Sequence, residues 1–203
     1  DTDFTALVFN DLHQNSKTYE ALLKKTVGID YDFVIFNGDC LPEPRDRAHA
    51  IRMIHNVTDP VGGAEKPVIF IRGNHEIRDF YSVGMHSLIG YRDGLTWGDT
   101  RFVVLDLGED KPDDTWVYYG LNDFTSLRND QVRFLKEELR SRDFRKAARH
   151  ILVSHIPVFA NTDKYQPCTE LYGSLLKGQP FDLALCAHVH ETAFYEKGTG
   201  GAP

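Results

Sequence analysis

The 203-residue sequence predicts an α/β fold, because short apolar runs of strand length alternate with segments of helical periodicity. Hydrophobic residues make up 41% of the chain and charged residues 26%, a composition typical of folded globular proteins. The sequence contains neither an internal repeat nor a low-complexity tract. Because no interior boundary is visible, we expect one domain over residues 1–203.

Strands are predicted where β-branched and aromatic residues gather in short runs. The segment Arg101–Leu105, which follows a Gly98-Asp99 turn, is typical of a hairpin strand, as is Trp116–Tyr119. The predicted strands are residues 4–9, 33–36, 67–71, 101–105, 116–119, 151–153 and 183–187.

Helices are predicted between these strands, at residues 16–27, 46–56, 130–142 and 169–176. Ser16 is the expected N-cap of the first, which places Tyr19, Leu22 and Leu23 on one face. Residues 198–203 are predicted as a terminal linker.

The charge and the apolar runs exclude two classes of partner. The formal net charge is −7 and the pI is about 5.7, the opposite of the basic surface that binds a nucleic-acid backbone. We therefore expect no long nucleic acid as a partner. The longest apolar runs, such as 33–36 and 68–71, fall far short of the roughly 20 residues that a membrane-spanning helix needs.

The cysteines and the first residue bear on the cellular compartment. Cys40, Cys168 and Cys186 are odd in number and match no CxxC or zinc-finger spacing, which excludes a disulfide framework. The chain starts at Asp1 without a methionine or an apolar leader, which fits a cleaved signal peptide or a trimmed chain. Both a cytoplasmic and an exported protein fit these observations.

Metal-ligating side chains stand directly after five of the predicted strands. In open α/β sheets, ligands bind at the carboxyl ends of the strands. We therefore expect these residues to converge on one site that holds metal ions. Within the pairs Asp11/His13 and His188/His190 we expect both side chains to point the same way from extended backbone. The five blocks are Asp11-Leu12-His13, Gly38-Asp39, Gly73-Asn74-His75-Glu76, His155 and His188-Val189-His190.

In these blocks the chain resembles the calcineurin-like metallophosphoesterase superfamily, whose ordered pattern is DxH, GD, GNH[DE], a lone His and HxH. Any one block is a weak signal, but five in the family's order between Asp11 and His190 are specific. The resemblance implies a β-sandwich flanked by helices, with the metal site at the carboxyl ends of the strands. Fewer residues follow His190 than relatives generally have, so a closing strand is either missing or supplied elsewhere.

The resemblance also implies two divalent ions that share one carboxylate. The first would be held by Asp11, His13, Asp39 and His190, and the second by Asp39, Asn74, His155 and His188. Oxygen and imidazole donors without a thiolate favour Mn, Fe, Zn or Ni.

The implied activity is hydrolysis of a phosphomonoester or a small phosphodiester by a metal-bridging hydroxide, with a small phosphorylated molecule as substrate. Asp39 would act through the bridge. His75 would be the general acid rather than a ligand, with Glu76 or another acid orienting its second nitrogen. Asn74 and Arg78 are the expected contacts to the substrate.

Two other interpretations are weaker. A metal domain that binds phosphorylated ligands without turnover is the main alternative, but the complete ligand set and the intact His75 argue against it. His188–Glu191 also resembles the start of an HxHxDH metallo-hydrolase motif, yet Ala193 stands where that motif has an acid.

Overall fold

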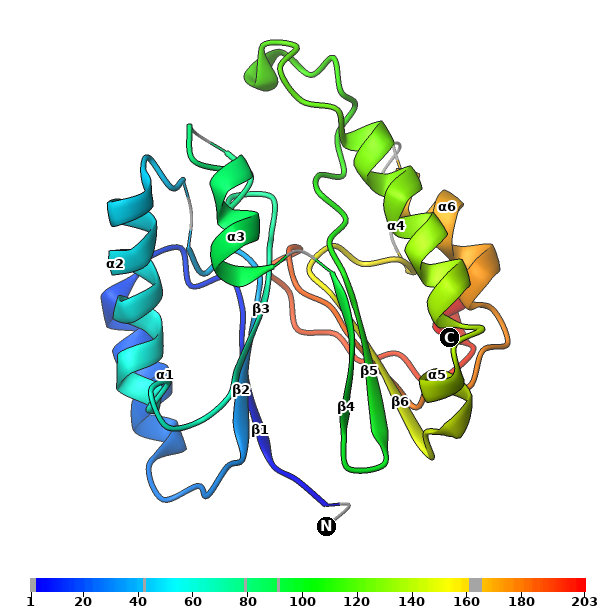
Figure 1. The fold of residues 1–203 in the computed structure, drawn as a ribbon, viewed down its shortest axis with the longest axis horizontal. Coiled ribbons are helices and arrows are strands. Elements are labelled where there is room, and N and C mark those ends of the chain that lie inside the picture. The colour runs from blue at the N-terminus through cyan, green and yellow to red at the C-terminus, as the bar shows by residue number, and fades with distance from the viewer. Residues whose placement is uncertain (1–2, 42, 79, 91, 161–165) are drawn as a thin grey trace. The chain divides into compact units, whose positions relative to one another are not determined.

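The computed structural model describes residues 3–41, 43–78, 80–90, 92–160 and 166–203. The chain forms two compact units, Asp3–Tyr91 and Arg92–Pro203, and each contains one sheet flanked by helices (Figure 1). The predicted α/β class is therefore confirmed, whereas the single domain stays a prediction. None of the described helices combines the length and the apolar composition that a membrane span requires.

The sheet of the first unit consists of three parallel strands in the order β1 (Ala6–Phe9), β2 (Phe33–Asn37) and β3 (Val68–Ile71). Helices α1 (Ser16–Thr26) and α2 (Arg47–Thr58) pack on one face. Their Tyr19 and Met53 meet Phe9, Val34 and Phe36 of the strands in one core cluster. Because the three strands are parallel, the segments that follow them leave the sheet at the same edge.

The ends of the first unit's helices are set by side-chain caps. Asn15, rather than the expected Ser16, caps α1, since its side chain accepts a hydrogen bond from the Thr18 N–H at 3.0 Å. Asp46 caps α2 through the His49 N–H at 2.7 Å. Three short helical turns complete the unit: η1 (Asp59–Val61), η2 (Val83–Met85) and α3 (His86–Ile89).

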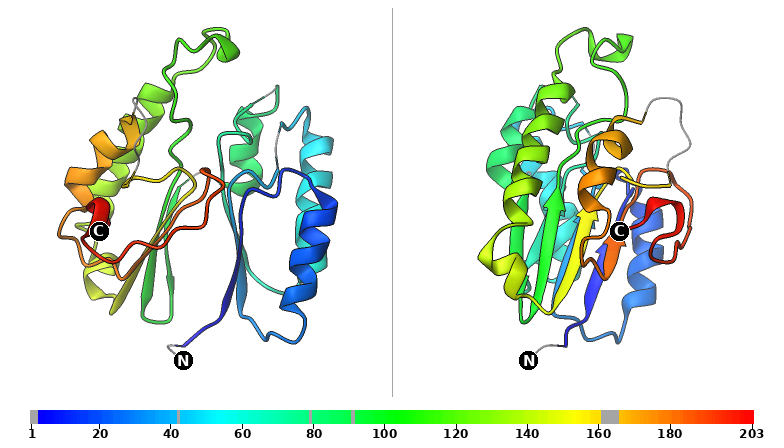
Figure 2. Two further views of the ribbon diagram at one scale, coloured as in Figure 1. Left: turned by 180° about the vertical axis from the view of Figure 1, so that it is seen from behind. Right: turned by 90° about the vertical axis from the view of Figure 1, so that its right-hand side faces the viewer.

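The sheet of the second unit has four strands in the order β4 (Asp93–Trp97), β5 (Thr100–Leu105), β6 (Arg149–Ser154) and β7 (Leu183–Leu185). β4 is antiparallel to β5, and the other pairs are parallel. Helices α4 (Phe124–Glu138) and α6 (Pro167–Leu176) lie side by side against one face, joined where the Tyr172 hydroxyl donates to the Arg128 carbonyl at 2.8 Å (Figure 2).

Three predictions in this unit need correction. The hairpin at Gly98-Asp99 exists, but its first strand, β4, was not predicted, because Asp93 and Gly94 have low strand propensity. In a strand of residues 116–119, Trp116 and Tyr118 would share one face, but Trp116 is exposed and Tyr118 is buried, and the segment instead forms the 3-10 helix η3 (Trp116–Tyr118). The expected C-terminal linker contains a 3-10 turn, η4 (Thr199–Gly201).

Helix α4 starts and ends earlier than its apolar periodicity predicts. Asp123 caps it by accepting from the Ser126 N–H at 2.9 Å, and Asp113 accepts from the Phe124 N–H at 2.9 Å. Ser141 then caps a separate short helix, α5 (Arg142–Lys146), so the chain turns after Glu138. The long connection from β5 to α4 extends beyond the N-terminal end of that helix (Figure 1).

A buried ion pair joins β5 to α4. Arg101 Nε donates to Glu138 Oε1 at 2.7 Å, one guanidinium NH2 group lies 3.0 Å from Glu138 Oε2, and both side chains are less than a tenth exposed. A Cβ at Gly94 would lie 2.3 Å from the guanidinium, so β4 needs glycine here to leave room for the pair.

Replacing Glu138 with alanine should therefore destabilise the protein strongly. The guanidinium of Arg101 would stay buried without its carboxylate, which costs about 3–5 kcal/mol of unfolding free energy. Urea denaturation measures the loss. The double variant Arg101→Met/Glu138→Leu is the control, because an apolar pair of similar volume often restores stability. A single variant as stable as the wild type would contradict a structural role for the pair.

Candidate metal and catalytic site

The loops after β1, β2 and β3 bring four predicted site residues together: Asp11, His13, Asp39 and His75. His13 Nε2 lies 3.8 Å from Asp11 Oδ1 and 3.8 Å from Asp39 Oδ2. Two donors that each sit about 2.1 Å from one ion can be no more than about 4.2 Å apart. The distance from His13 to each of the two carboxylates is therefore short enough for a shared divalent ion.

His75 lies against the same carboxylate. Its Nε2 is 3.9 Å from Asp39 Oδ2, and its ring meets that of His13 edge-on, with 4.7 Å between the ring centroids. Distance alone would thus allow His75 to be a ligand, and its predicted role as a non-ligating acid stays a prediction. Asn74, its neighbour in the chain, is buried in this loop.

Backbone conformation is unusual at the proposed ligands. Five of them adopt a positive φ: Asp11 (50°), His13 (46°), Asp39 (53°), His188 (73°) and His190 (55°). The expectation of extended backbone within the two pairs is therefore wrong, and left-handed turns set the side-chain directions instead. Non-glycine residues rarely adopt this conformation, and such outliers gather at functional sites.

Glu76 holds the loops of the first unit together. Its carboxylate accepts backbone N–H bonds from Asp39 at 2.9 Å, Leu41 at 2.6 Å and Gly73 at 2.7 Å. In turn the His75 N–H donates to Asp39 Oδ1 at 2.9 Å. Glu76, which was expected to orient the His75 ring, thus acts on the backbone of the loops after β2 and β3.

Other groups surround the His75 ring. A guanidinium nitrogen of Arg78 lies 3.2 Å from Nε2 and 3.3 Å from Nδ1, and the Glu43 carboxylate is 4.0 Å from Nδ1. Burial is the main factor that lowers the pKa of His75. The negative charge of Asp39 opposes this effect, whereas the positive charge of Arg78 lowers the pKa further. Arg78 is therefore placed beside the proposed acid, where it can also meet an anionic group.

In the second unit, the segments after β6 and β7 bring His155 and His188 together. Their ring centroids are 5.3 Å apart, and the Ala187 N–H donates to the His155 carbonyl at 2.8 Å. His155 is buried and His188 is half-buried. His190 follows on the same segment, with an exposed side chain.

The structure adds one residue that the sequence prediction missed. Asp110, in the segment after β5, accepts a hydrogen bond from His188 Nε2 at 2.8 Å. Burial would raise the pKa of Asp110, but the hydrogen bond from His188 and the charge of Lys111 lower it well below its ordinary value. The signal was available, because Glu109 and Asp110 follow a strand that is parallel to its neighbour β6.

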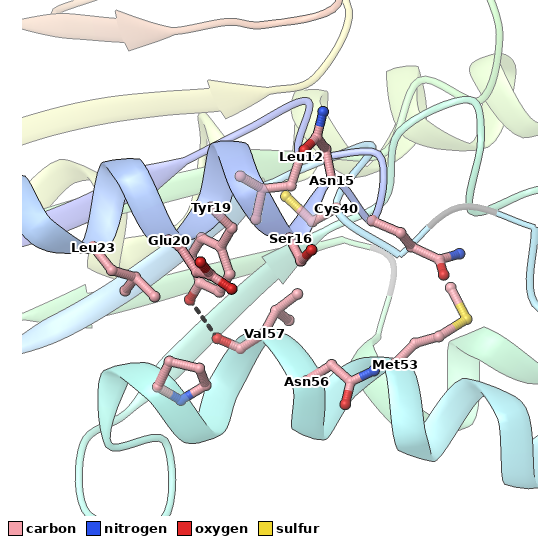
Figure 3. Close-up of a pocket in the computed structure, with 12 residues that line it drawn as sticks. Leu12, Asn15, Ser16, Tyr19, Glu20, Leu23, Cys40, Met53, Asn56 and Val57 are labelled. Carbon is pink, nitrogen blue, oxygen red and sulfur yellow. Dashed lines mark hydrogen bonds between the residues drawn. The ribbon is translucent and has the colours of Figure 1, made fainter.

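A cavity of about 290 Å³ lies between α1 and α2 in the first unit (Figure 3). Cys40, Tyr19 and Met53 line it, and the Tyr19 hydroxyl donates to the Val57 carbonyl across it at 2.5 Å. Burial raises the pKa of the Cys40 thiol well above its ordinary value. This cavity is mainly apolar, and Cys40 is a buried residue of its wall.

The comparisons with known proteins agree with this chemistry. The model of the calcineurin-like phosphoesterase family matches residues 4–192. Among solved structures, the chain is similar to a dimetal phosphatase from Danio rerio, with a TM-score of 0.61 and 17% sequence identity over 87% of this chain and 78% of that one. The comparison with curated proteins gives no match. Because the family model spans nearly the whole chain, the protein belongs to the calcineurin-like phosphoesterase family.

Proposed function

We propose that this protein hydrolyses phosphomonoesters or small phosphodiesters with two divalent metal ions. The observation that carries the proposal is the Asp39 carboxylate, which is buried and has one oxygen 3.8 Å from His13 Nε2 and 3.9 Å from His75 Nε2. A carboxylate in that position can bridge ions, as the family pattern implies. The Danio rerio neighbour, described as a dimetal phosphatase, supports the same class of reaction.

The proposed ligands are the seven residues of the family pattern. They are Asp11, His13, Asp39 and His190 for one ion and Asp39, Asn74, His155 and His188 for the other. Their carboxylate, amide and imidazole donors suit Mn, Fe, Zn or Ni. Such ions, when bound, neutralise phosphoryl oxygens and lower the pKa of a water molecule.

The remaining steps belong to the protein's own side chains. His75 donates a proton to the leaving oxygen. The hydrogen bond from its backbone N–H to Asp39 Oδ1 fixes the position of the His75 backbone beside that carboxylate. Arg78 beside the ring places a positive charge where a phosphate ester would bind, and Asn74 contacts the same group. A bound phosphate would favour the protonated form of His75, which the free site disfavours.

Metal content tests the ligand assignment. The wild-type chain should approach two ions per chain in elemental analysis after loading with Mn²⁺. Asp39→Asn should lose both metal affinity and nearly all turnover, because one carboxylate serves both ions and its charge offsets theirs. Asp59→Asn, which alters an exposed acid beside His55, is the matched control and should keep both. Saturation at one ion, or full activity of Asp39→Asn at limiting metal, would contradict the dinuclear assignment.

Because Asp39 is proposed to hold both ions, metal binding should also require glycine at position 73. A Cβ there would lie 2.2 Å from Asp39 Oδ1 and 2.6 Å from the Asp39 nitrogen. Gly73→Ala should displace the carboxylate and weaken Mn²⁺ binding by roughly 10- to 100-fold. Gly173→Ala in α6, where a Cβ meets nothing within 4 Å, is the control. Equal Mn²⁺ affinity for both variants would mean that the Asp39 position does not govern binding.

His75 is tested through the leaving group. His75→Asn should leave the metal content unchanged but slow hydrolysis of esters with high-pKa leaving groups by roughly 10²- to 10⁴-fold. A nitrophenyl ester should suffer less, because nitrophenolate departs as a stable anion without a proton. The measurement is kcat across a leaving-group series, with metal content determined in both proteins. A uniform loss across the series would remove His75 as the acid, and loss of metal would make it a ligand.

A further inference from the structure

The Asp110–His188 contact lies in a part of the second unit where parallel strands end side by side. β5 pairs with β6 up to Leu105 and Ser154, and β6 pairs with β7 up to Val153 and Leu185. The segments that carry Asp110, His155 and His188 therefore leave the sheet at one edge. The contact joins residues 78 positions apart in the chain, so the fold rather than local sequence produces it.

The hydrogen bond defines which nitrogen of His188 carries a proton. An aspartate is ionised at neutral pH and can only accept hydrogen bonds. Asp110 Oδ2 lies 2.8 Å from His188 Nε2, so Nε2 must be the donor. In the neutral imidazole, Nδ1 then holds the lone pair. A metal ion bound by His188 in this tautomer would therefore be bound through Nδ1.

Asp110 is itself held in place by its two neighbours in the chain, Glu109 and Lys111. Lys111 Nζ lies 3.2 Å from Asp110 Oδ1 and 3.1 Å from Glu109 Oε1. The Asp110 N–H donates to Glu109 Oε1 at 3.0 Å, and the Tyr118 hydroxyl donates to the other oxygen of Glu109. Glu109 is fully buried, and Arg128 donates to its carbonyl at 2.5 Å.

These contacts argue against a separate cation site at Glu109, Asp110 and His188, although the three could supply ligand atoms. Lys111 already places a positive charge between the two carboxylates. Asp110 Oδ2, the oxygen turned away from Lys111, is occupied by His188. Lys111 therefore offsets one of the two carboxylate charges, and His188 takes the place at Oδ2 that a further ion would need.

We propose that Asp110 is a positioning residue, which fixes the ring of His188 with Nε2 protonated so that Nδ1 is presented to a metal ion. The inference rests on the proposed function, since it assumes that His188 is a ligand. A carboxylate that accepts from the far nitrogen of a ligating histidine orients the ring and raises its basicity, and its loss typically reduces metal affinity 10- to 100-fold.

The test uses the full chain and Asp110→Asn. An amide can donate as well as accept, so it no longer enforces one tautomer of His188. In the metal-free protein, ¹⁵N NMR of the histidine rings should show Nε2-protonated His188 in the wild type and a mixture in the variant, with the signals assigned from His188→Gln. Mn²⁺ affinity, measured by electron paramagnetic resonance, should fall roughly 10- to 100-fold in Asp110→Asn.

Asp99→Asn is the matched control. Asp99 pairs with Arg149 at 2.7 Å near the opposite end of β5, so this variant removes an equal charge away from His188. Its Mn²⁺ affinity and His188 tautomer should match the wild type, and Asp110→Asn should unfold at a similar urea concentration, which excludes general misfolding.

Different experimental outcomes would overturn the proposed function and the positioning role of Asp110. A wild-type chain that binds no Mn²⁺ would overturn the proposed function. Wild-type Mn²⁺ binding together with unchanged affinity in Asp110→Asn would overturn the positioning role alone. A loss of affinity in Asp110→Asn with the His188 tautomer unchanged would also overturn it, because Asp110 would then act as a ligand or through its charge.

Discussion

The first unit depends on the fixed position of one buried carboxylate, that of Asp39. Its backbone N–H is held by Glu76, its Oδ1 accepts from the His75 N–H, and its carbonyl accepts from the His13 N–H at 2.8 Å. Three loops that follow three parallel strands are thus tied to one residue. Oδ2 is the oxygen turned towards the imidazoles of His13 and His75, so the same bonds that join the loops also aim the carboxylate.

This arrangement requires backbone conformations that most residues avoid. A left-handed residue costs roughly 1–2 kcal/mol relative to the right-handed form, and Asp and His are among the types that tolerate it best. Asp11, His13 and Asp39 share it within one unit. The hydrogen bonds from Asp11 N to the Gly38 carbonyl and from His13 N to the Asp39 carbonyl offset that cost. The local geometry is therefore specific to these loops and is maintained by contacts between them.

The sequence predicts the strands and the residues after them well, because a buried parallel strand is a continuous apolar run and its end is marked by the first polar side chains. It fails where the contacts are long-range. Trp116–Tyr119 has strand propensity but pairs with no strand of the described residues, whereas β4 has a partner although it begins with Asp93 and Gly94, which have low strand propensity. The direction of Asp11 and His13 could not be derived from their spacing, since their backbone is left-handed and depends on bonds to residues 38 and 39.

The acids at the strand ends show why residue type alone does not assign a role. Asp39, Glu76 and Asp110 all follow strands of a parallel pair and are all buried or nearly so, yet their oxygens have different neighbours. Glu76 accepts hydrogen bonds from three backbone N–H groups, so its carboxylate serves to hold the backbone of the loops. Asp110 faces an imidazole and an ammonium. Asp39 keeps one oxygen beside the imidazoles of His13 and His75. This difference in neighbours, which only the folded loops create, is the reason why we propose Asp39 as a ligand and the other two acids as residues that support the site.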